Sequence, residues 1–179
     1  LKHTTWDDLI ENVAIKAISV AQEISGSKQI NALGFCVGGT ILSNALAVLA
    51  ARKQKPVASA TLLTTLIDFT DTGILDVFID EGMVKYRESQ FAEGGLMKGK
   101  DMASSDSTNL PGPMYAWYLR NTYLENNLIK PGKAVVCGEK IDLRKVDTPL
   151  YLYASREDHI VPIGGAYAST QVFPGKKRF

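Results

Sequence analysis

A cysteine set among glycines is the residue of this sequence best suited to nucleophilic chemistry. Cys36 lies in the run Gly34-Phe35-Cys36-Val37-Gly38-Gly39, with a predicted strand over 29–34 before it and a predicted helix over 41–51 after it. Small neighbours let the backbone turn sharply between strand and helix, which would lift the thiol to the carboxyl edge of a sheet. We expect Cys36 to be a nucleophile, and the backbone amide of Val37, at the start of the helix, to donate to a substrate oxyanion.

Both cysteines also have a structural interpretation, because a free cysteine in a core usually behaves as a small apolar side chain. The strand before Cys36 and the helix after it favour the nucleophile at that position. Cys137 has only Gly138 beside it and is expected to be structural. Two cysteines, one of them in a glycine cluster, do not suggest a disulfide framework, so a reducing, cytoplasmic setting is predicted.

A cysteine nucleophile needs a base, usually histidine, that is held by an acid. The predicted turn at Cys36 is typical of the nucleophile elbow of α/β-hydrolases, in which the nucleophile is followed along the chain by the acid and then by the histidine. Asp158 follows a strand predicted over 148–154 and fits the position of the acid. An aspartate in a loop is ordinarily a solvated turn residue, so this assignment depends on Cys36.

The general base is not supplied in the expected order. His159 directly follows Asp158, and adjacent residues of an extended segment point to opposite sides, so Asp158 cannot readily orient it. A second interpretation makes His159 the base with Asp68 or Asp71 as its acid, although this breaks the usual chain order. His3, before the first predicted helix, is not expected to take part.

The hydrophobic pattern indicates an α/β fold with a mostly parallel sheet flanked by helices. Apolar residues three or four apart from Trp6 to Ile24 predict a helix that stops at Gly26, and 57–67 reads as a second strand. We predict an α/β-hydrolase-like core with the elbow over 1–67, a cap (lid) insertion over 68–130, and a return to the core with the acid loop over 131–179.

Three shorter segments carry weaker signals. The stretch 94–109 is rich in glycine and serine and predicts a loop, and 134–137 predicts a short strand. Tyr115 to Tyr123 predict an aromatic helix, which either lines a substrate path or packs in the core.

Composition narrows the choice of partners. Twenty lysines and arginines against 19 aspartates and glutamates give a net charge of +1, so no global field favours nucleic acid or an anionic membrane. No apolar run approaches the roughly 18 residues of a membrane-spanning helix. The cysteines and histidines show no metal-ligand spacing, and no metal is predicted.

Four strings of the sequence together resemble the polyhydroxyalkanoate synthases, and the Phe and Val of the first look like the class I enzymes that prefer short-chain monomers. The strings are Gly34 to Thr40, Leu62 to Phe69, Asn109 to Pro113 and Ser155 to Pro162. The resemblance implies a cysteine-histidine-aspartate triad with Cys36 as nucleophile and Asp158 as acid. It places the family's histidine beyond Phe179, in a glycine-histidine segment.

The resemblance also implies a reaction. An (R)-3-hydroxyacyl group, with 3-hydroxybutyryl-coenzyme A as the expected donor, moves to the Cys36 thiolate, and the hydroxyl of a growing polyester then attacks the thioester. Asp158 is expected to assist deprotonation of that hydroxyl. Coenzyme A is part of the substrate, so no cofactor is expected. The family further implies a cytoplasmic homodimer at the surface of polymer granules.

The resemblance also bears on the extent of the chain. Family members have an N-terminal region and earlier core strands, and this sequence begins with Leu1, so we expect it to be a piece of a larger protein. The family's cap is longer, so we expect omitted residues at a join near Ser104-Ser105.

Two other functions compete with this interpretation. A cysteine hydrolase of the dienelactone hydrolase type would pass the acyl group to water and would not depend on coenzyme A. A non-catalytic α/β-hydrolase-like module would bind partners through its cap, with an unreactive Cys36.

Overall fold

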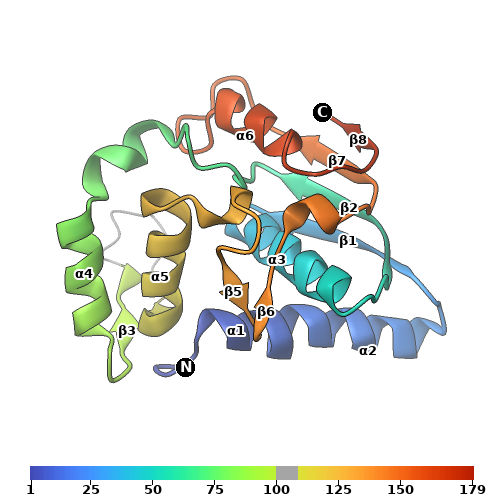
Figure 1. Ribbon diagram of the computed structural model, residues 1–179, viewed down its shortest axis with the longest axis horizontal. Helices are drawn as coiled ribbons and strands as arrows, with labels where there is room; N and C mark the ends of the chain where they lie inside the picture. The colour runs from blue at the N-terminus through green and yellow to red at the C-terminus, as the bar shows by residue number, and fades with distance from the viewer. Residues whose placement is uncertain (100–108) are drawn as a thin grey trace.

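The computed structural model describes residues 1–99 and 109–179, and a parallel sheet lies between helices α6 (Ile163–Thr170) and α3 (Val37–Ala51) on the right of Figure 1. Within the described residues its strand order is β1-β2-β7-β8. The strands are β1 Ile30–Phe35, β2 Val57–Leu63, β7 Leu150–Tyr153 and β8 Lys177–Arg178. The first three confirm the predicted strands. The fourth falls in a basic cluster that gave no strand signal.

The predicted N-terminal helix forms as α1 Trp6–Asp8, a π-helical segment η1 Leu9–Ile15 and α2 Lys16–Ser25. Thr5 caps it, because its hydroxyl accepts from the Asp8 amide while the Asp8 carboxylate accepts from the Thr5 amide. Gly26 ends it in the left-handed conformation, as predicted. The π-helical turns had no sequence signal.

Helix α3, Val37–Ala51, begins at the residue after Cys36, four residues earlier than predicted. Almost every side chain from Gly39 to Leu49 is buried, because α3 lies between the sheet and the N-terminal helix (Figure 1). A helix that is apolar all round belongs in such an enclosed place.

The two faces of the sheet differ in burial. Gly34, Leu62 and Leu152 are paired across β1, β2 and β7 and are buried on the same face. The adjacent residues face the other way, and Phe35 is 64% and Tyr153 50% exposed. The prediction of a buried first strand is therefore correct for one face only.

The described residues between β2 and residue 134 lie to one side of the sheet (Figure 1, left). Their elements are η2 Gly73–Phe78, α4 Glu81–Gln90, β3 Leu96–Met97, β4 Leu110–Pro111, α5 Gly112–Leu119, η4 Arg120–Leu124 and η5 Asn127–Ile129. Helix α4 packs against α5, and the guanidinium of Arg120 bonds to Glu81, Glu88 and Glu125, which ties α4 to η4.

Three predictions fall in that segment. The loop expected over 94–109 contains β3, which pairs with β4, and the rest of it lies largely outside the described residues. The predicted join near Ser104-Ser105 also lies outside them. The aromatic helix is confirmed as α5 and η4, and the assignment of 68–130 as a cap stays a prediction.

The C-terminal third returns to the sheet. The strand predicted over 134–137 is wrong in extent, because the chain forms a small hairpin of β5 Val135–Val136 and β6 Glu139–Lys140 outside the main sheet. A 3₁₀ turn η6 Leu143–Lys145 follows, and helix α6 Ile163–Thr170 lies between β7 and β8. None of the helices among the described residues is long and apolar enough to cross a membrane.

Candidate active site

Cys36 sits in a sharp turn between β1 and α3, with φ 53° and ψ −126°. This backbone conformation is rare for any residue with a Cβ and is costly unless the surroundings enforce it. They do so here: the Cys36 amide donates to the Leu63 carbonyl at 2.8 Å, and the Cys36 carbonyl accepts from the Gly39 amide at 2.9 Å. The predicted strand, tight turn and helix are all present, and the thiol is exposed.

The glycines around Cys36 serve different purposes. A Cβ on Gly34 would lie 2.5 Å from the Gly39 Cα, and a Cβ on Gly39 would overlap the side chain of Thr65. A Cβ on Gly38 would meet no atom within 4 Å. Close backbone packing therefore requires glycine at 34 and 39, whereas the space beside Gly38 is open.

The amide of Val37 lies at the N-terminal end of α3, and its role as an oxyanion donor stays a prediction. Val37 is the first residue of α3, a helix of 15 residues, so its N–H is among those without an intrahelical acceptor. The N-terminal end of the helix adds a partial positive charge beside the Cys36 thiol.

Asp158 lies in the loop that follows β7. Strand β7 pairs in parallel with β2, and β2 with β1, so this loop and Cys36 occupy the same carboxyl edge of the sheet. The Asp158 carboxylate accepts from the amides of Ile160 at 2.9 Å and Val161 at 3.0 Å. These bonds fix a half-buried carboxylate on a tight turn.

In the part of the chain that the structure describes, neither His3 nor His159 forms a hydrogen bond or ion pair with an acidic side chain. Among the described residues His159 has no hydrogen bond or ion pair to Asp68 or Asp71, and its side chain is exposed. The Asp68 carboxylate instead accepts from Thr70 and Asn126; burial opposes its ionised form, but these bonds outweigh it and lower its pKa. His3 packs beside Gly94.

A cluster of aromatic rings lies between the N-terminal helix and the aromatic helix. Trp6 stacks on Trp117 at 4.7 Å and on Tyr118 at 5.5 Å between ring centroids. Phe69 meets Tyr118 and Tyr123 edge-on, at 6.1 and 4.9 Å. Burial raises the pKa of Tyr118 well above its usual value and that of Tyr123 to about 12, with the Cys36 thiolate a further cause in both. Sequence alone did not reveal that these two phenols are within electrostatic range of Cys36.

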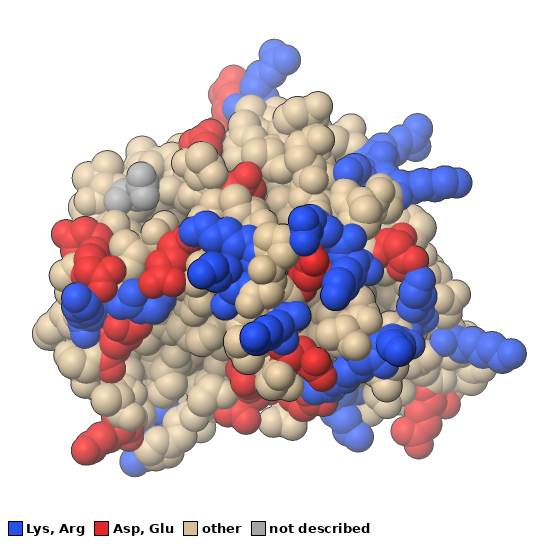
Figure 2. Space-filling view, in the orientation of Figure 1, with Lys and Arg blue, Asp and Glu red and all other residues tan. Residues whose placement is uncertain are grey.

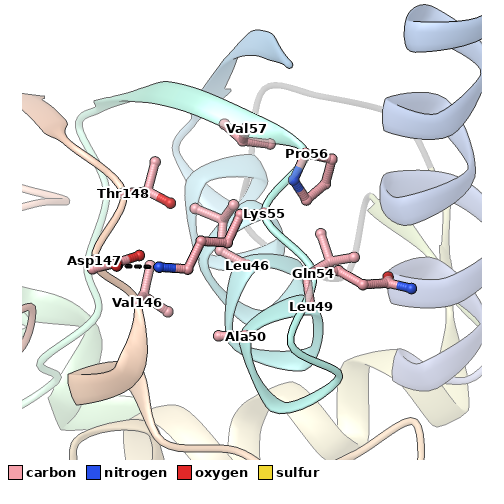
Figure 3. Close-up of a pocket in the computed structure, with 10 residues that line it drawn as sticks. All are labelled: Leu46, Leu49, Ala50, Gln54, Lys55, Pro56, Val57, Val146, Asp147 and Thr148. Atoms are coloured by element: carbon pink, nitrogen blue, oxygen red, sulfur yellow. Dashed lines mark hydrogen bonds and ion pairs between the residues drawn. The ribbon is translucent and has the colours of Figure 1, made fainter. Parts of the chain in front are cut away.

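A pocket at the opposite edge of the sheet has no part in this site. It is lined by the C-terminal half of α3 and by residues just before β2 and β7, including Leu49, Pro56 and Thr148 (Figure 3). The ion pair between Lys55 and Asp147 closes one side of it. Its volume of about 10 Å³ has room for a water molecule and not for an acyl group.

The chain matches the family model described as alpha/beta hydrolase fold over residues 3–179. It is similar in fold to a monoacylglycerol lipase from Paleococcus ferrophilus, with a TM-score of 0.62, 13% identity and coverage of 98% of this chain and 64% of that one. A putative hydrolase from Agrobacterium vitis gives a TM-score of 0.59 at 16% identity, over 100% of this chain and 61% of that one. The chain therefore belongs to the alpha/beta hydrolase fold family.

Within that family the chain is related to the poly(3-hydroxyalkanoate) polymerases. It is 51% identical to the polymerase subunit PhaC of Cupriavidus necator, over 98% of this chain and 36% of that protein. The corresponding subunit of Rhizobium meliloti is 34% identical, over 91% of this chain and 32% of that protein. The predicted resemblance is confirmed, and the chain spans about a third of the length of these relatives.

The first of these alignments is longer than the chain, although its length does not place the unmatched residues, and the join near Ser104-Ser105 stays a prediction. It extends over 215 residues, more than the 179 of this chain. The Cupriavidus subunit therefore has residues within the aligned region that have no counterpart here.

Proposed function

We propose that the chain carries the nucleophile and the acid of a polyhydroxyalkanoate polymerase. The observation that carries this proposal is the strained turn that presents Cys36 at the N-terminal end of α3, in a chain 51% identical to a protein named as a polymerase subunit. Such strain is kept where a reactive group must be exposed. The related lipase and hydrolase support only the fold.

The proposed reaction has two acyl transfers. The Cys36 thiolate attacks the thioester carbonyl of (R)-3-hydroxybutyryl-coenzyme A, the Val37 amide donates to the oxyanion, and coenzyme A leaves as a thiolate that takes up a proton. The hydroxyl at the end of the polyester then attacks the Cys36 thioester. That hydroxyl loses its proton, the Cys36 thiolate is released, and the polymer is one unit longer.

Cysteine suits this cycle, because exchange between two thioesters is nearly balanced and a thiolate both attacks and leaves easily. Asp158 would assist deprotonation of the incoming hydroxyl. The family's histidine, proposed to lie beyond Phe179, would take the thiol proton. The proposal includes a homodimer at the surface of polymer granules in the cytoplasm.

The charges on the face shown in Figure 2 do not form a single broad positive field. Figure 2 shows basic and acidic side chains interspersed over one face of the molecule, in keeping with the net charge of +1. Coenzyme A would then need a local binding site and not a general positive field.

The test uses the full-length protein, meaning the complete reading frame that encodes this chain. We would supply 3-hydroxybutyryl-coenzyme A and follow free coenzyme A and insoluble polymer, with Cys36→Ala as the variant and Cys137→Ala as its matched control. We expect Cys36→Ala to lose both products and the control to keep both. Coenzyme A release without polymer would identify a hydrolase, and activity in Cys36→Ala would remove Cys36 from the mechanism.

A further inference from the structure

The loop after β2 contacts the elbow at Cys36 through the hydroxyl of Thr65. The Thr65 Oγ1 lies 3.1 Å from the Cys36 carbonyl oxygen and 3.0 Å from the Leu63 carbonyl oxygen, so its single proton is shared between the two. The Leu63 carbonyl is itself the acceptor of the Cys36 amide. Thr65 therefore contacts the peptide group after Cys36 directly, and the peptide group before Cys36 only through the Leu63 carbonyl.

The Thr65 side chain is buried, so water could not easily replace the hydrogen bonds of its hydroxyl. Thr65 is only 3% exposed. It fits against α3 because residue 39 is glycine, since any Cβ there would overlap the Thr65 side chain. On the opposite side of this contact the Thr40 hydroxyl donates to the Leu66 carbonyl at 2.9 Å. Two threonines, one from each segment, therefore join the loop to the start of α3.

The backbone is strained to bring Thr65 into this position. Thr64 has φ 43°, a left-handed conformation that β-branched residues rarely adopt. The reversal ends β2 at Leu63, although the predicted strand continued to Ile67. Such strain persists only where the surrounding contacts enforce it, and here the bonds of Thr65 to the elbow are among those contacts.

The peptide bond links Thr65 to the chemistry. The carbonyl of Cys36 and the amide of Val37 belong to one planar trans peptide group, so a bond that holds the carbonyl also fixes the direction of the N–H. A donor on that carbonyl further polarises the group and makes its N–H a stronger donor. We propose that Thr65 is a positioning residue that aligns the Val37 amide as the oxyanion donor by holding the other end of the same peptide group.

This inference rests on the proposed function and predicts a specific pattern of rates. Thr65→Ser and Thr65→Ala both lack the γ-methyl group and differ only in the hydroxyl. Removing an oxyanion donor outright costs about 10²–10³ in rate, so misaligning one is expected to cost about 10-fold. We expect single-turnover release of coenzyme A from 3-hydroxybutyryl-coenzyme A to be about 10-fold slower in Thr65→Ala than in Thr65→Ser.

The rate at which iodoacetamide alkylates Cys36 distinguishes a misplaced Val37 amide from a general disturbance of the elbow. Displacement of iodide develops no oxyanion, so the alkylation rates of the two variants should agree within about twofold. Thr61→Val, in β2 just before this loop, is the matched control and should leave both rates unchanged. Thr65→Val is measured as a third variant in case Thr65→Ala does not fold.

Two results would overturn the role of Thr65. If Thr65→Ala lowers the rates of acylation and of alkylation by the same factor, Thr65 supports the elbow as a whole. If Thr65→Ser and Thr65→Ala are acylated at the same rate, the hydroxyl is not needed. Failure of the proposed function is distinguishable, because Cys36→Ala would then still release coenzyme A.

Discussion

The two cysteines both have a positive φ, but they differ in burial, in neighbouring charge and in the elements around them. Cys36 has φ 53° and Cys137 has φ 51°. Cys36 is exposed where a strand meets the N-terminal end of α3. Cys137 is half-buried in the turn of the β5–β6 hairpin, and its thiol donates to the Asp7 carbonyl at 3.5 Å.

The electrostatic environments of the two sites are opposite. Burial, together with the negative charges of Asp7 and Glu11, raises the pKa of the Cys137 thiol to about 12. At Cys36 the nearest end of a helix carries a partial positive charge. A positive φ at a cysteine is therefore not enough to predict a nucleophile, and the prediction for Cys36 depends on the strand and helix around it.

The largest expected difference is in alkylation. A pKa of about 12 leaves only roughly 10⁻⁴ of Cys137 as thiolate at pH 8. We expect iodoacetamide at pH 8 to label Cys36 at least about 100-fold faster than Cys137, as followed by mass spectrometry of tryptic peptides. Cys36→Ala should then show almost no early labelling. Similar rates at the two positions would break the comparison.

The next largest expected difference is in the free energy of unfolding when a glycine near each cysteine is replaced by alanine. A Cβ at Gly39 would collide with Thr65, so Gly39→Ala is expected to lower the free energy of unfolding by about 3 kcal/mol. Gly138 has φ 77° and open space around it, so Gly138→Ala should cost only about 1 kcal/mol of torsional strain.

Gly38→Ala is the matched control for these two substitutions, since Gly38 has open space and a helical position, and we expect a change within about 1 kcal/mol. Urea denaturation of the full-length protein measures all three. A Gly39→Ala variant as stable as Gly38→Ala would contradict the close packing of the elbow.

Local patterns predicted the elbow, because everything that builds it lies within a few residues. Glycines flank Cys36, an apolar strand precedes it and an apolar helix follows it, and each signal is short-range. The position of Asp158 followed from the same logic after β7. What sequence could not supply was the contact from Thr65, since residues 29 positions apart meet only after β1 and β2 have paired.

Two failures have physical causes as well. Thr64 to Ile67 are residue types common in strands, yet the left-handed turn at Thr64 ends β2 earlier, because tertiary contacts override propensity. The hairpin at Cys137 was missed because Cys-Gly is not among the usual two-residue turn sequences, such as Asn-Gly.

The raised pKa of Cys137 should be visible in how the stability of the protein changes with pH. Its pKa is raised above its ordinary value, so the fold favours the neutral thiol; this contribution is complete below about pH 9 and is lost as the pH rises toward 12. We expect Cys137→Ser, which does not titrate in this window, to lose less stability than the parent between pH 8 and pH 10.5. The thermal unfolding midpoints of the parent and of the variant are measured at pH 8 and at pH 10.5. For each protein, the decrease in midpoint from its own value at pH 8 is compared. Parallel declines would mean that the thiol is not buried as described.

The smallest effect tests whether the left-handed backbone at Cys137 is only a requirement of the turn. Cys137 and Gly138 both have positive φ, as in the type I′ turns that favour Asn-Gly. Cys137→Asn is therefore expected to raise the free energy of unfolding by about 0.5 kcal/mol in urea denaturation, with polymer formation unchanged. The same change at Cys36 should abolish polymer formation, because it removes the proposed nucleophile. A loss of activity in Cys137→Asn would show that the hairpin takes part in the reaction, and the contrast between the two cysteines would then be one of degree.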